Sequence, residues 1–263
     1  MDNIIQFRGK RIRYQDRGTG PVVVLLHGFL EDSSLWNFLM PSIQNNFRTL
    51  LIDLPGHGLS EPLDEVQEMG LIAEAVAAVL DSCKVDKASI IGHSMGGYIA
   101  MAFADLFPEK LEGLCLFHSH PFEDVPMKKL ERLRIVDAIE AGKKDFIRLA
   151  LPNFIASQNQ DRLQPEIEQM IRVGEQTSLE GVKLALKGMA LRQDCSHLLA
   201  TLNCSKFVVI GDSDPSVPVD RLLSFCKDKK IAHSLIKGCG HMGYIEQPET
   251  CKAVLFDFLK KLS

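Results

Sequence analysis

The strongest constraint on the fold is an alternation of short, β-rich apolar runs with segments that repeat apolar residues at helical spacing. Continuous apolar runs suit strands that are covered on both faces, as in a parallel sheet. The predicted strands are Ile4–Phe7, Ile12–Gln15, Val22–Leu26, Thr49–Ile52, Ala88–Ile91, Gly113–Phe117, Phe207–Ile210 and Ala232–Ile236. The first two should form a hairpin around Gly9-Lys10. The alternation predicts the α/β class, with a mainly parallel sheet and helices on both faces.

Two segments show the apolar stripe of an amphipathic helix. Val66–Cys83 carries apolar residues at positions 72, 75, 76, 79, 80 and 83, and the segment after Pro248 repeats the pattern to the end of the chain. Residues 121–198 are helix-rich and charged and contain no convincing strand. We therefore predict an α/β core formed by residues 1–120 and 199–263, with a helical cap inserted over residues 121–198 and packed on that core.

Charge and hydropathy exclude two classes of partner. The 263 residues carry a net charge of −4, and lysines and arginines are scattered, so nucleic acid is not an expected partner. Residues 1–8 lack the basic start and apolar stretch of an export signal, and no apolar run approaches the roughly 20 residues that cross a bilayer. We expect a soluble, cytoplasmic protein that acts on a small molecule, with no membrane partner; its oligomeric state is left open.

The cysteines predict no disulfide framework and no metal site. There are seven, an odd number, and none forms a C-x-x-C pair. We expect reduced and mostly buried thiols. A cysteine nucleophile is disfavoured because we expect none of the seven cysteines to be exposed by a glycine-containing turn.

The segment Gly92-His93-Ser94-Met95-Gly96-Gly97 lies between a predicted strand and an apolar stretch that should be helical. A serine at such a turn has a strained backbone and an exposed hydroxyl, and only glycine-sized neighbours avoid the crossing strand and helix. The backbone N–H of Met95, at the positive end of the helix, would stabilise an oxyanion. The motif predicts Ser94 as a nucleophile; because it is short, a plain glycine-rich turn is the alternative.

A second anion-binding position is predicted after the strand Val22–Leu26. His27-Gly28-Phe29 follows that strand, where the N–H of Phe29 would face Ser94. Two such donors are worth about 3 kcal/mol each to the transition state. The alternative is that His27 and Gly28 only close the strand.

A general base is predicted in Gly240-His241-Met242-Gly243, a short loop after the strand Ala232–Ile236. A histidine there can reach over Ser94, accept its proton and return it to a leaving group near neutral pH. The competing interpretation is a surface histidine without a role.

Carboxylates that could orient His241 cluster in Gly211–Pro218, after the strand Phe207–Ile210. Asp214 is the predicted partner, and the order Ser, Asp, His is the one used by serine enzymes with this type of turn. Asp212 is the nearer rival. Glu123 and Asp124, after the strand Gly113–Phe117, are the remote ones.

Taken in order, these segments resemble the α/β-hydrolase superfamily over nearly the whole chain outside the cap. The resemblance rests on His27-Gly28, Asp53–Ser60, Gly92–Gly97, Gly211–Pro218 and Gly240-His241. Asp214 matches the acid that the family places three residues after a glycine. The resemblance implies an eight-stranded core, a lid after the sixth strand, and hydrolysis without metal or cofactor. Asp53–Ser60 matches the family's glycine-rich turn after its fourth strand, and we expect it to be structural.

Two departures weaken narrower assignments within the family. Phe29 stands where many cofactor-free perhydrolases have tryptophan. Tyr98 stands where the similar vitamin K pathway synthase has arginine.

The substrate pocket is expected to be lined by residues next to these loops. The predicted lining is His27, Gly28, His93, His118 and Phe122, with Phe29, Met95 and Leu151 as further apolar walls. His118 and His120 could suggest a metal site, but no third ligand on the same face is evident, so no metal is predicted.

The leading hypothesis is hydrolysis of a small, mostly apolar carboxylic ester through an acyl-enzyme. Lactone, amide or carbon–carbon bond hydrolysis with the same residues is the alternative, and the cap would decide between them. A serine at position 94, in the turn Gly92–Gly97, argues against an aspartate nucleophile. A ligand sensor of the same fold is a more remote possibility, because nothing in the sequence indicates a partner surface.

Overall fold

The computed structural model describes residues 2–63, 66–140 and 142–262; residues 1, 64, 65 and 263 of the predicted core and residue 141 of the predicted cap lie outside these ranges. All eight predicted strands are present. They are β1 (Asp2–Phe7), β2 (Lys10–Arg17), β3 (Val22–Leu26), β4 (Arg48–Ile52), β5 (Ala88–His93), β6 (Leu111–Phe117), β7 (Ser205–Gly211) and β8 (Ala232–Ile236).

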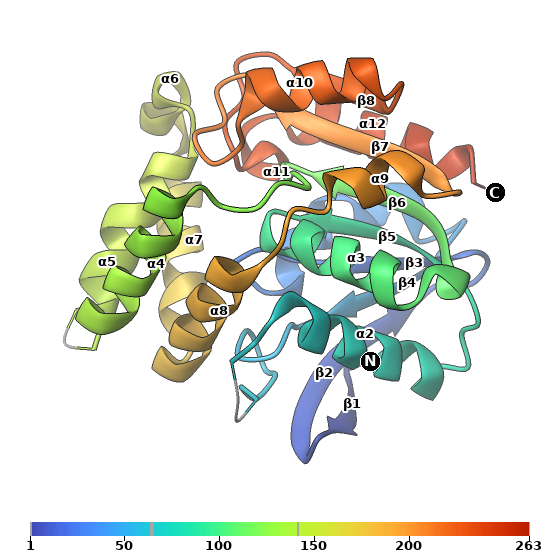
Figure 1. Cartoon of the computed structure of the whole chain (residues 1–263), viewed down its shortest axis with the longest axis horizontal. Coiled ribbons are helices and arrows are strands. Elements are labelled where there is room, and N and C mark those ends of the chain that lie inside the picture. The colour runs from blue at the N-terminus through green and yellow to red at the C-terminus, as the bar shows by residue number, and fades with distance from the viewer. Residues whose placement is uncertain (1, 64–65, 141, 263) are drawn as a thin grey trace.

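The strands form one sheet in the order β1-β2-β4-β3-β5-β6-β7-β8 (Figure 1). β1 and β2 form the predicted hairpin, and β2 pairs antiparallel with β4. Every other neighbouring pair is parallel. The mainly parallel, eight-stranded sheet is therefore confirmed, and the carboxyl ends of its central strands meet at one edge, where loops can converge.

Helices cover both faces of the sheet, as predicted. Their bounds are α1 (Met40–Ile43), α2 (Met69–Ser82), α3 (Met95–Leu106), α4 (Pro126–Ala138), α5 (Lys143–Ala150), α6 (Ser157–Gln160), α7 (Gln164–Gln176), α8 (Leu179–Leu191), α9 (Ser196–Thr201), α10 (Val219–Asp228), α11 (Gly243–Glu246) and α12 (Pro248–Lys260). The helix predicted from Val66 begins at Met69, because Glu68 has an extended backbone with ψ near 148°.

The apolar run of β3 shows why the sheet needs a helical layer on each face. Val24 and Leu26 belong to the buried cluster that includes α2 and α3. Val23 and Leu25, which point the other way, belong to the cluster that includes α1 and α12. Each side chain buried in this way is worth about 1.5–3 kcal/mol, so both faces contribute to stability.

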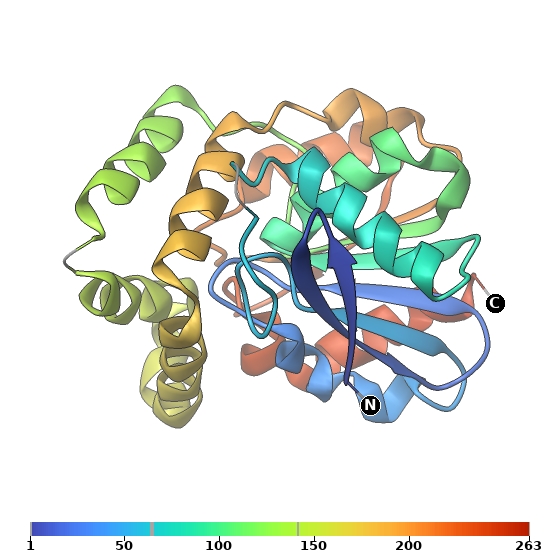
Figure 2. The same ribbon diagram turned by 90° about the horizontal axis from the view of Figure 1, so that it is seen from below.

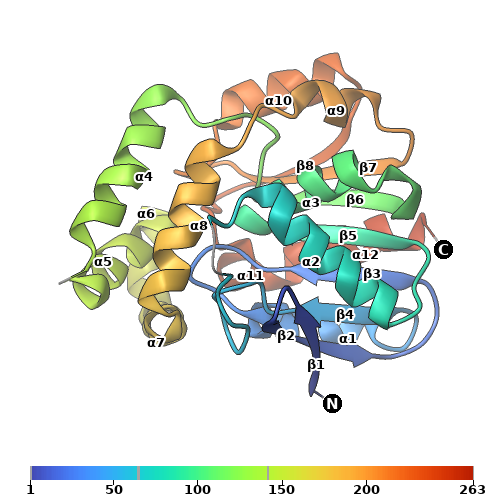
Figure 3. The ribbon, with the colours of Figure 1, turned by 60° about the horizontal axis from the view of Figure 1, so that its bottom comes forward.

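Helices α4 to α8 are inserted between β6 and β7 and lie to one side of the sheet (Figures 1 and 3). Figure 2 shows α8 between α4 and the core. Val182, Ala185 and Met189 of α8 join the buried cluster of α2 and α3, so α8 is packed on the core. The predicted limit between residues 198 and 199 falls within α9.

Two glycines of α8 lie against core loops more closely than any side chain would permit. A Cβ atom on Gly181 would be 2.2 Å from the carbonyl oxygen of Gly56, and one on Gly188 would be 1.8 Å from that of Gln67. These contacts fix α8 against the loop that precedes α2.

The turn Asp53–Ser60 is held by one carboxylate. Oδ1 of Asp53 accepts a hydrogen bond from the N–H of Ser33, and Oδ2 accepts one from the N–H of Leu59. The same carboxylate is paired with the guanidinium of Arg13. These contacts tie the turn to neighbouring segments, which is the structural role expected from the sequence.

All seven cysteines are free thiols, and four of them are buried. Burial raises the pKa of Cys226 to about 11, which disfavours a thiolate nucleophile there. None of the described helices has the length and apolar character needed to span a membrane.

Candidate active site

Ser94 lies on a sharp turn between β5, which ends at His93, and α3, which begins at Met95. Its backbone has φ 49° and ψ −115°, a sparsely populated region for a residue with a side chain. A Cβ atom on Gly92 would be 2.3 Å from the carbonyl oxygen of Gly96, and one on Gly96 would be 2.4 Å from that of Leu26. The glycines therefore permit the close crossing of strand and helix that forces Ser94 outward.

The structure brings the three predicted catalytic side chains together. Nε2 of His241 is 2.8 Å from Oγ of Ser94. Nδ1 of the same ring is 2.8 Å from Oδ2 of Asp214 and 3.0 Å from Oδ1. With the proton on Nδ1 donated to the carboxylate, Nε2 can accept the serine proton, which is the arrangement an activated serine requires.

Asp214 is buried and is held in place by its own loop. Its Oδ1 accepts hydrogen bonds from the N–H groups of Ser216 and Val217. Burial alone would raise the pKa of Asp214, but the charge and hydrogen bond of His241, together with the nearby His118 ring, outweigh it and hold the pKa far below its usual range. The carboxylate is therefore ionised at neutral pH, as an orienting acid must be.

The rival carboxylates have other partners. Oδ1 of Asp212 accepts hydrogen bonds from Ser213 and from the N–H of Cys239. Glu123 is paired with Lys129, and Asp124 is paired with two arginines. Contact with His241 is made by Asp214 instead.

The loop after β3 is held by the His27 ring. Nδ1 of His27 donates to the carbonyl oxygen of Gly28 at 2.7 Å, and Nε2 accepts from the N–H of Leu54 at 2.9 Å. Phe29, the next residue, lines the same cavity as Ser94. Met95 is the first residue of α3 and is fully buried. Oxyanion binding by the Phe29 and Met95 N–H groups stays a prediction.

Sequence reasoning missed a buried ion pair beneath the site. Oε2 of Glu31 lies 2.8 Å from Nδ1 of His93 and also accepts from the N–H of Gly28. Oε1 accepts from the hydroxyl of Tyr244, and Nε2 of His93 donates to the carbonyl oxygen of His241 at 3.0 Å. Glu31 therefore connects the loop that follows β3, strand β5 and the loop that carries His241. A carboxylate four residues after His27 was the available signal.

The pKa of His93 reflects this pairing. Burial lowers it, but the charge and hydrogen bond of Glu31 more than compensate, so the net shift is upward. For Glu31, burial raises the pKa. The charge and hydrogen bond of His93 outweigh this effect, so the net shift of the Glu31 pKa is downward. Both shifts favour a charged pair in the folded protein.

A cavity of about 380 Å³ opens over Ser94 and His241. This is within the roughly 300–1,000 Å³ range of small-molecule sites. Besides these two residues, it is lined by Phe29, Tyr98, His120, Phe122, Glu123, Asp124, Val125, Lys128, Arg132, Phe154, Met189, Pro215, Ser216, Val217, Pro218 and Arg221. Residues from α4 and α8 are among them, so the insertion forms part of the wall.

The predicted pocket lining is largely wrong. Phe122 and Phe29 line the cavity, whereas His27, Gly28, His93 and His118 do not. The three histidine rings are completely buried below the cavity, where they contact loops and, for His118, the Asp214 carboxylate at 3.5 Å. Of the other predicted walls, Met95 lies in the core and Leu151 lines a different cavity.

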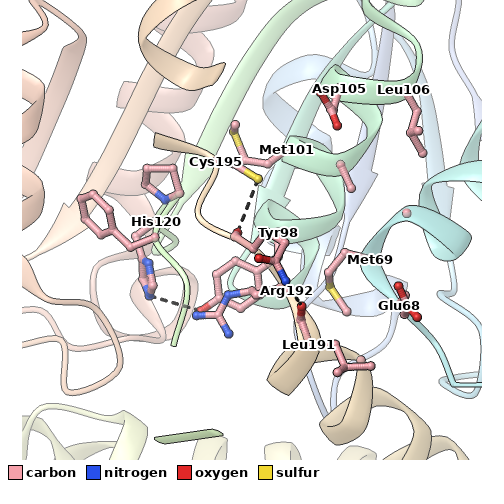
Figure 4. Close-up of a pocket in the computed structure, with 16 residues that line it drawn as sticks. Glu68, Met69, Tyr98, Met101, Asp105, Leu106, His120, Leu191, Arg192 and Cys195 are labelled. Carbon is pink, nitrogen blue, oxygen red and sulfur yellow. Dashed lines mark hydrogen bonds between the residues drawn. The ribbon is translucent and has the colours of Figure 1, made fainter. Parts of the chain in front are cut away.

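A second cavity, of about 200 Å³, is shown in Figure 4. Tyr98, His120 and Phe122 line both cavities and therefore form a shared wall. The hydroxyl of Tyr98 is 3.4 Å from Nε2 of His120, and the Arg192 guanidinium lies over the Tyr98 ring, 4.0 Å from its centre. The position of this wall was not predicted.

His118 and His120, the two histidines with alternate spacing, follow the end of β6. Within residues 2–63, 66–140 and 142–262, no three histidine, cysteine or acidic side chains are grouped so that they could hold a metal ion. His118 instead approaches Asp214, and His120 contacts Tyr98.

Known proteins similar to this chain have the same architecture. A family model described as the alpha/beta hydrolase fold matches residues 21–133. A 2-hydroxy-6-oxononadienedioate/2-hydroxy-6-oxononatrienedioate hydrolase of Paraburkholderia phymatum is 30% identical over 95% of this chain and 91% of its own length. A thermophilic esterase from Thermogutta terrifontis, solved with malate bound, is 29% identical, with a TM-score of 0.92 over 100% of this chain and 99% of that one.

A more distant neighbour shares the fold. The enol-lactonase from Burkholderia xenovorans superimposes with a TM-score of 0.88 over 98% of this chain and 100% of that one, at 20% identity.

Proposed function

The chain belongs to the α/β-hydrolase superfamily, and from that premise we propose that it is a serine hydrolase that cleaves a small carboxylic ester through an acyl-enzyme. The observation that carries the proposal is the continuous contact from Asp214 through His241 to Oγ of Ser94. The strained backbone of Ser94 supports it, because strain of this kind is maintained where function requires it.

In the proposed reaction, Oγ of Ser94 attacks the ester carbonyl while Nε2 of His241 takes the hydroxyl proton. Asp214 stabilises the imidazolium that forms. The N–H groups of Phe29 and Met95 are the proposed donors to the oxyanion. His241 then gives the proton to the leaving alcohol, and water releases the acid from Ser94 by the same steps.

The proposal is tested by labelling the purified protein with a fluorophosphonate probe and measuring intact mass. We expect one adduct on the wild type and none on Ser94→Ala or His241→Ala. Hydrolysis of a p-nitrophenyl ester should fall at least about a thousandfold in Ser94→Ala. Ser213→Ala, which removes an exposed hydroxyl from a neighbouring loop, is the control and should keep the adduct. An adduct that persists on Ser94→Ala would refute the assignment.

Carbon–carbon or lactone hydrolysis is the second candidate, and it is favoured by the relatives. The Paraburkholderia relative is a hydrolase of 2-hydroxy-6-oxononadienedioate, and its similarity extends over almost the whole chain. Comparing kcat/KM for an aryl ester, a lactone and a diketone distinguishes the candidates. We expect the ester to be preferred; binding of ligands with negligible turnover of all three would instead favour a sensor.

A further inference from the structure

A buried cluster of charges forms part of the active-site cavity wall. Oδ2 of Asp124 lies 2.6 Å from Nε of Arg132, on α4, and 2.7 Å from Nη1 of Arg192, which follows α8. Oδ1 of Asp124 also accepts from Nη2 of Arg192 at 2.8 Å. Arg192 therefore grips the carboxylate with two nitrogens, while Arg132 approaches it with one.

The charges in this cluster do not balance. Two guanidinium groups face one carboxylate, and arginine stays protonated in proteins. Burial would raise the pKa of Asp124, but hydrogen bonds from Arg192 and Arg132 outweigh it and lower the pKa, so the carboxylate is ionised. One positive charge is left over.

The other charged residues of the cavity do not cancel this excess. Three have partners of their own at the surface, namely Lys128 with Glu131, Glu123 with Lys129, and Arg221 with Asp194. His120 adds no charge, because burial and the nearby Arg192 lower its pKa to about 3. A cavity wall that holds an uncompensated charge is suited to an anion.

The two arginines differ in their access to the cavity. Arg192 is 5% exposed, donates to the carbonyl oxygen of Met189 as well as to Asp124, and lies on the Tyr98 ring (Figure 4). Arg132 lines the cavity and is 14% exposed. Its Nε is used by Asp124 and its Nη1 lies 3.4 Å from Sδ of Met189. In the part of the chain that the structure describes, Nη2 of Arg132 has no hydrogen-bond partner.

We propose that Arg132 binds a free carboxylate of the substrate, so that the preferred ester carries a second, ionised carboxyl group remote from the scissile bond. The inference rests on the proposed serine hydrolase function and narrows its substrate class from small carboxylic esters to half-esters of dicarboxylic acids, which replace the mostly apolar esters expected from the sequence. Arg132 acts as a specificity-determining residue, supplied by the insertion, while Asp124 and Arg192 hold its guanidinium in place.

The test compares two esters whose acyl chains have equal length, p-nitrophenyl hydrogen adipate and p-nitrophenyl hexanoate. We expect the wild type to favour the anionic ester in kcat/KM, mainly through KM. In Arg132→Met the ratio of the two kcat/KM values should fall about tenfold or more, because a hydrogen bond to a charged group is lost. Arg132→Lys keeps the charge and should recover part of the preference.

Arg134→Met is the matched control, because Arg134 lies on the same helix, is exposed, and does not line this cavity. It should leave both activities and their ratio unchanged. Melting temperatures of the variants show whether they are folded, and Arg192 remains to pair Asp124 in Arg132→Met. If both esters require Ser94 but the ratio is the same in wild type and Arg132→Met, the carboxylate site is refuted alone. If neither ester requires Ser94, the proposed function fails as well.

Discussion

At the scale of single residues, two carboxylates only two positions apart have different environments. Asp214 is buried against His241, whereas Asp212 is exposed and bonds to Ser213 and to the N–H of Cys239. Both follow β7 closely enough in the sequence to be candidates for the partner of His241. Because their hydrogen-bond partners differ, we expect the same substitution to have different effects on kcat at the two positions.

Asp214→Asn should lower kcat for ester hydrolysis by about a thousandfold or more. An amide can hold the His241 ring in the wrong tautomer and cannot stabilise the imidazolium. Asp212→Asn is the matched change and should leave kcat within about threefold of wild type. Steady-state kinetics on one ester measures both. Equal losses in the two variants would contradict the assignment of Asp214.

The sequence predicts which residues lie on the loops that follow the strands. It predicts the directions in which their side chains point much less well. Ser94, His241 and Asp214 were predicted because each follows a recognisable strand. The pocket histidines were predicted wrongly, since ring direction depends on distant partners. His93, for example, points at Glu31 rather than at the substrate, although the two are 62 positions apart.

At the scale of elements, the strands were predictable because parallel strands covered on both faces are continuously apolar. The start of α2 was not, because it depends on the extended backbone of Glu68. The sequence also gave no sign that α8 is fixed by contact of its glycines with core loops. We propose that the cap spans residues 121–198 and that these glycine contacts hold it on the core.

Gly188→Ala should destabilise the protein by about 1–3 kcal/mol. Within a helix, alanine is more favourable than glycine by about 1 kcal/mol. At position 188, however, the added Cβ would lie 1.8 Å from the Gln67 carbonyl oxygen and would force α8 away from the core. Gly70→Ala in α2 is the control, because the nearest atom to its added Cβ lies 3.6 Å away. Urea unfolding measures both. A Gly188→Ala variant as stable as Gly70→Ala would show that α8 can shift freely.

At the scale of the whole molecule, buried neutral histidines make stability depend on pH. Burial lowers the pKa of His57 to about 3, and burial together with Arg192 lowers that of His120 to about 3. Below the unfolded value of 6.5, the unfolded chain takes up protons that the folded protein does not. The contribution of these groups is therefore complete above pH 6.5 and is lost progressively as pH falls toward 3.

For His120 the predicted loss between pH 6.5 and pH 5 is about 2 kcal/mol of unfolding free energy. His120→Gln should therefore reduce the difference between the unfolding free energies at these two pH values by about that amount. His197→Gln, at an exposed histidine, is the control and should leave the difference unchanged. Urea titrations at both pH values test this. An unchanged difference in His120→Gln would mean that His120 is protonated in the folded protein.

The wall shared by the two cavities has a consequence for how this chain can diversify. Because Tyr98, His120 and Phe122 line both cavities, a substitution at any of these three positions changes the shape of both. We expect a smaller side chain at position 122 to widen the connection between the two cavities. Evolution toward bulkier acyl groups therefore has a short route here, a one-residue change at an internal partition, which leaves Ser94, His241 and their supporting loops untouched.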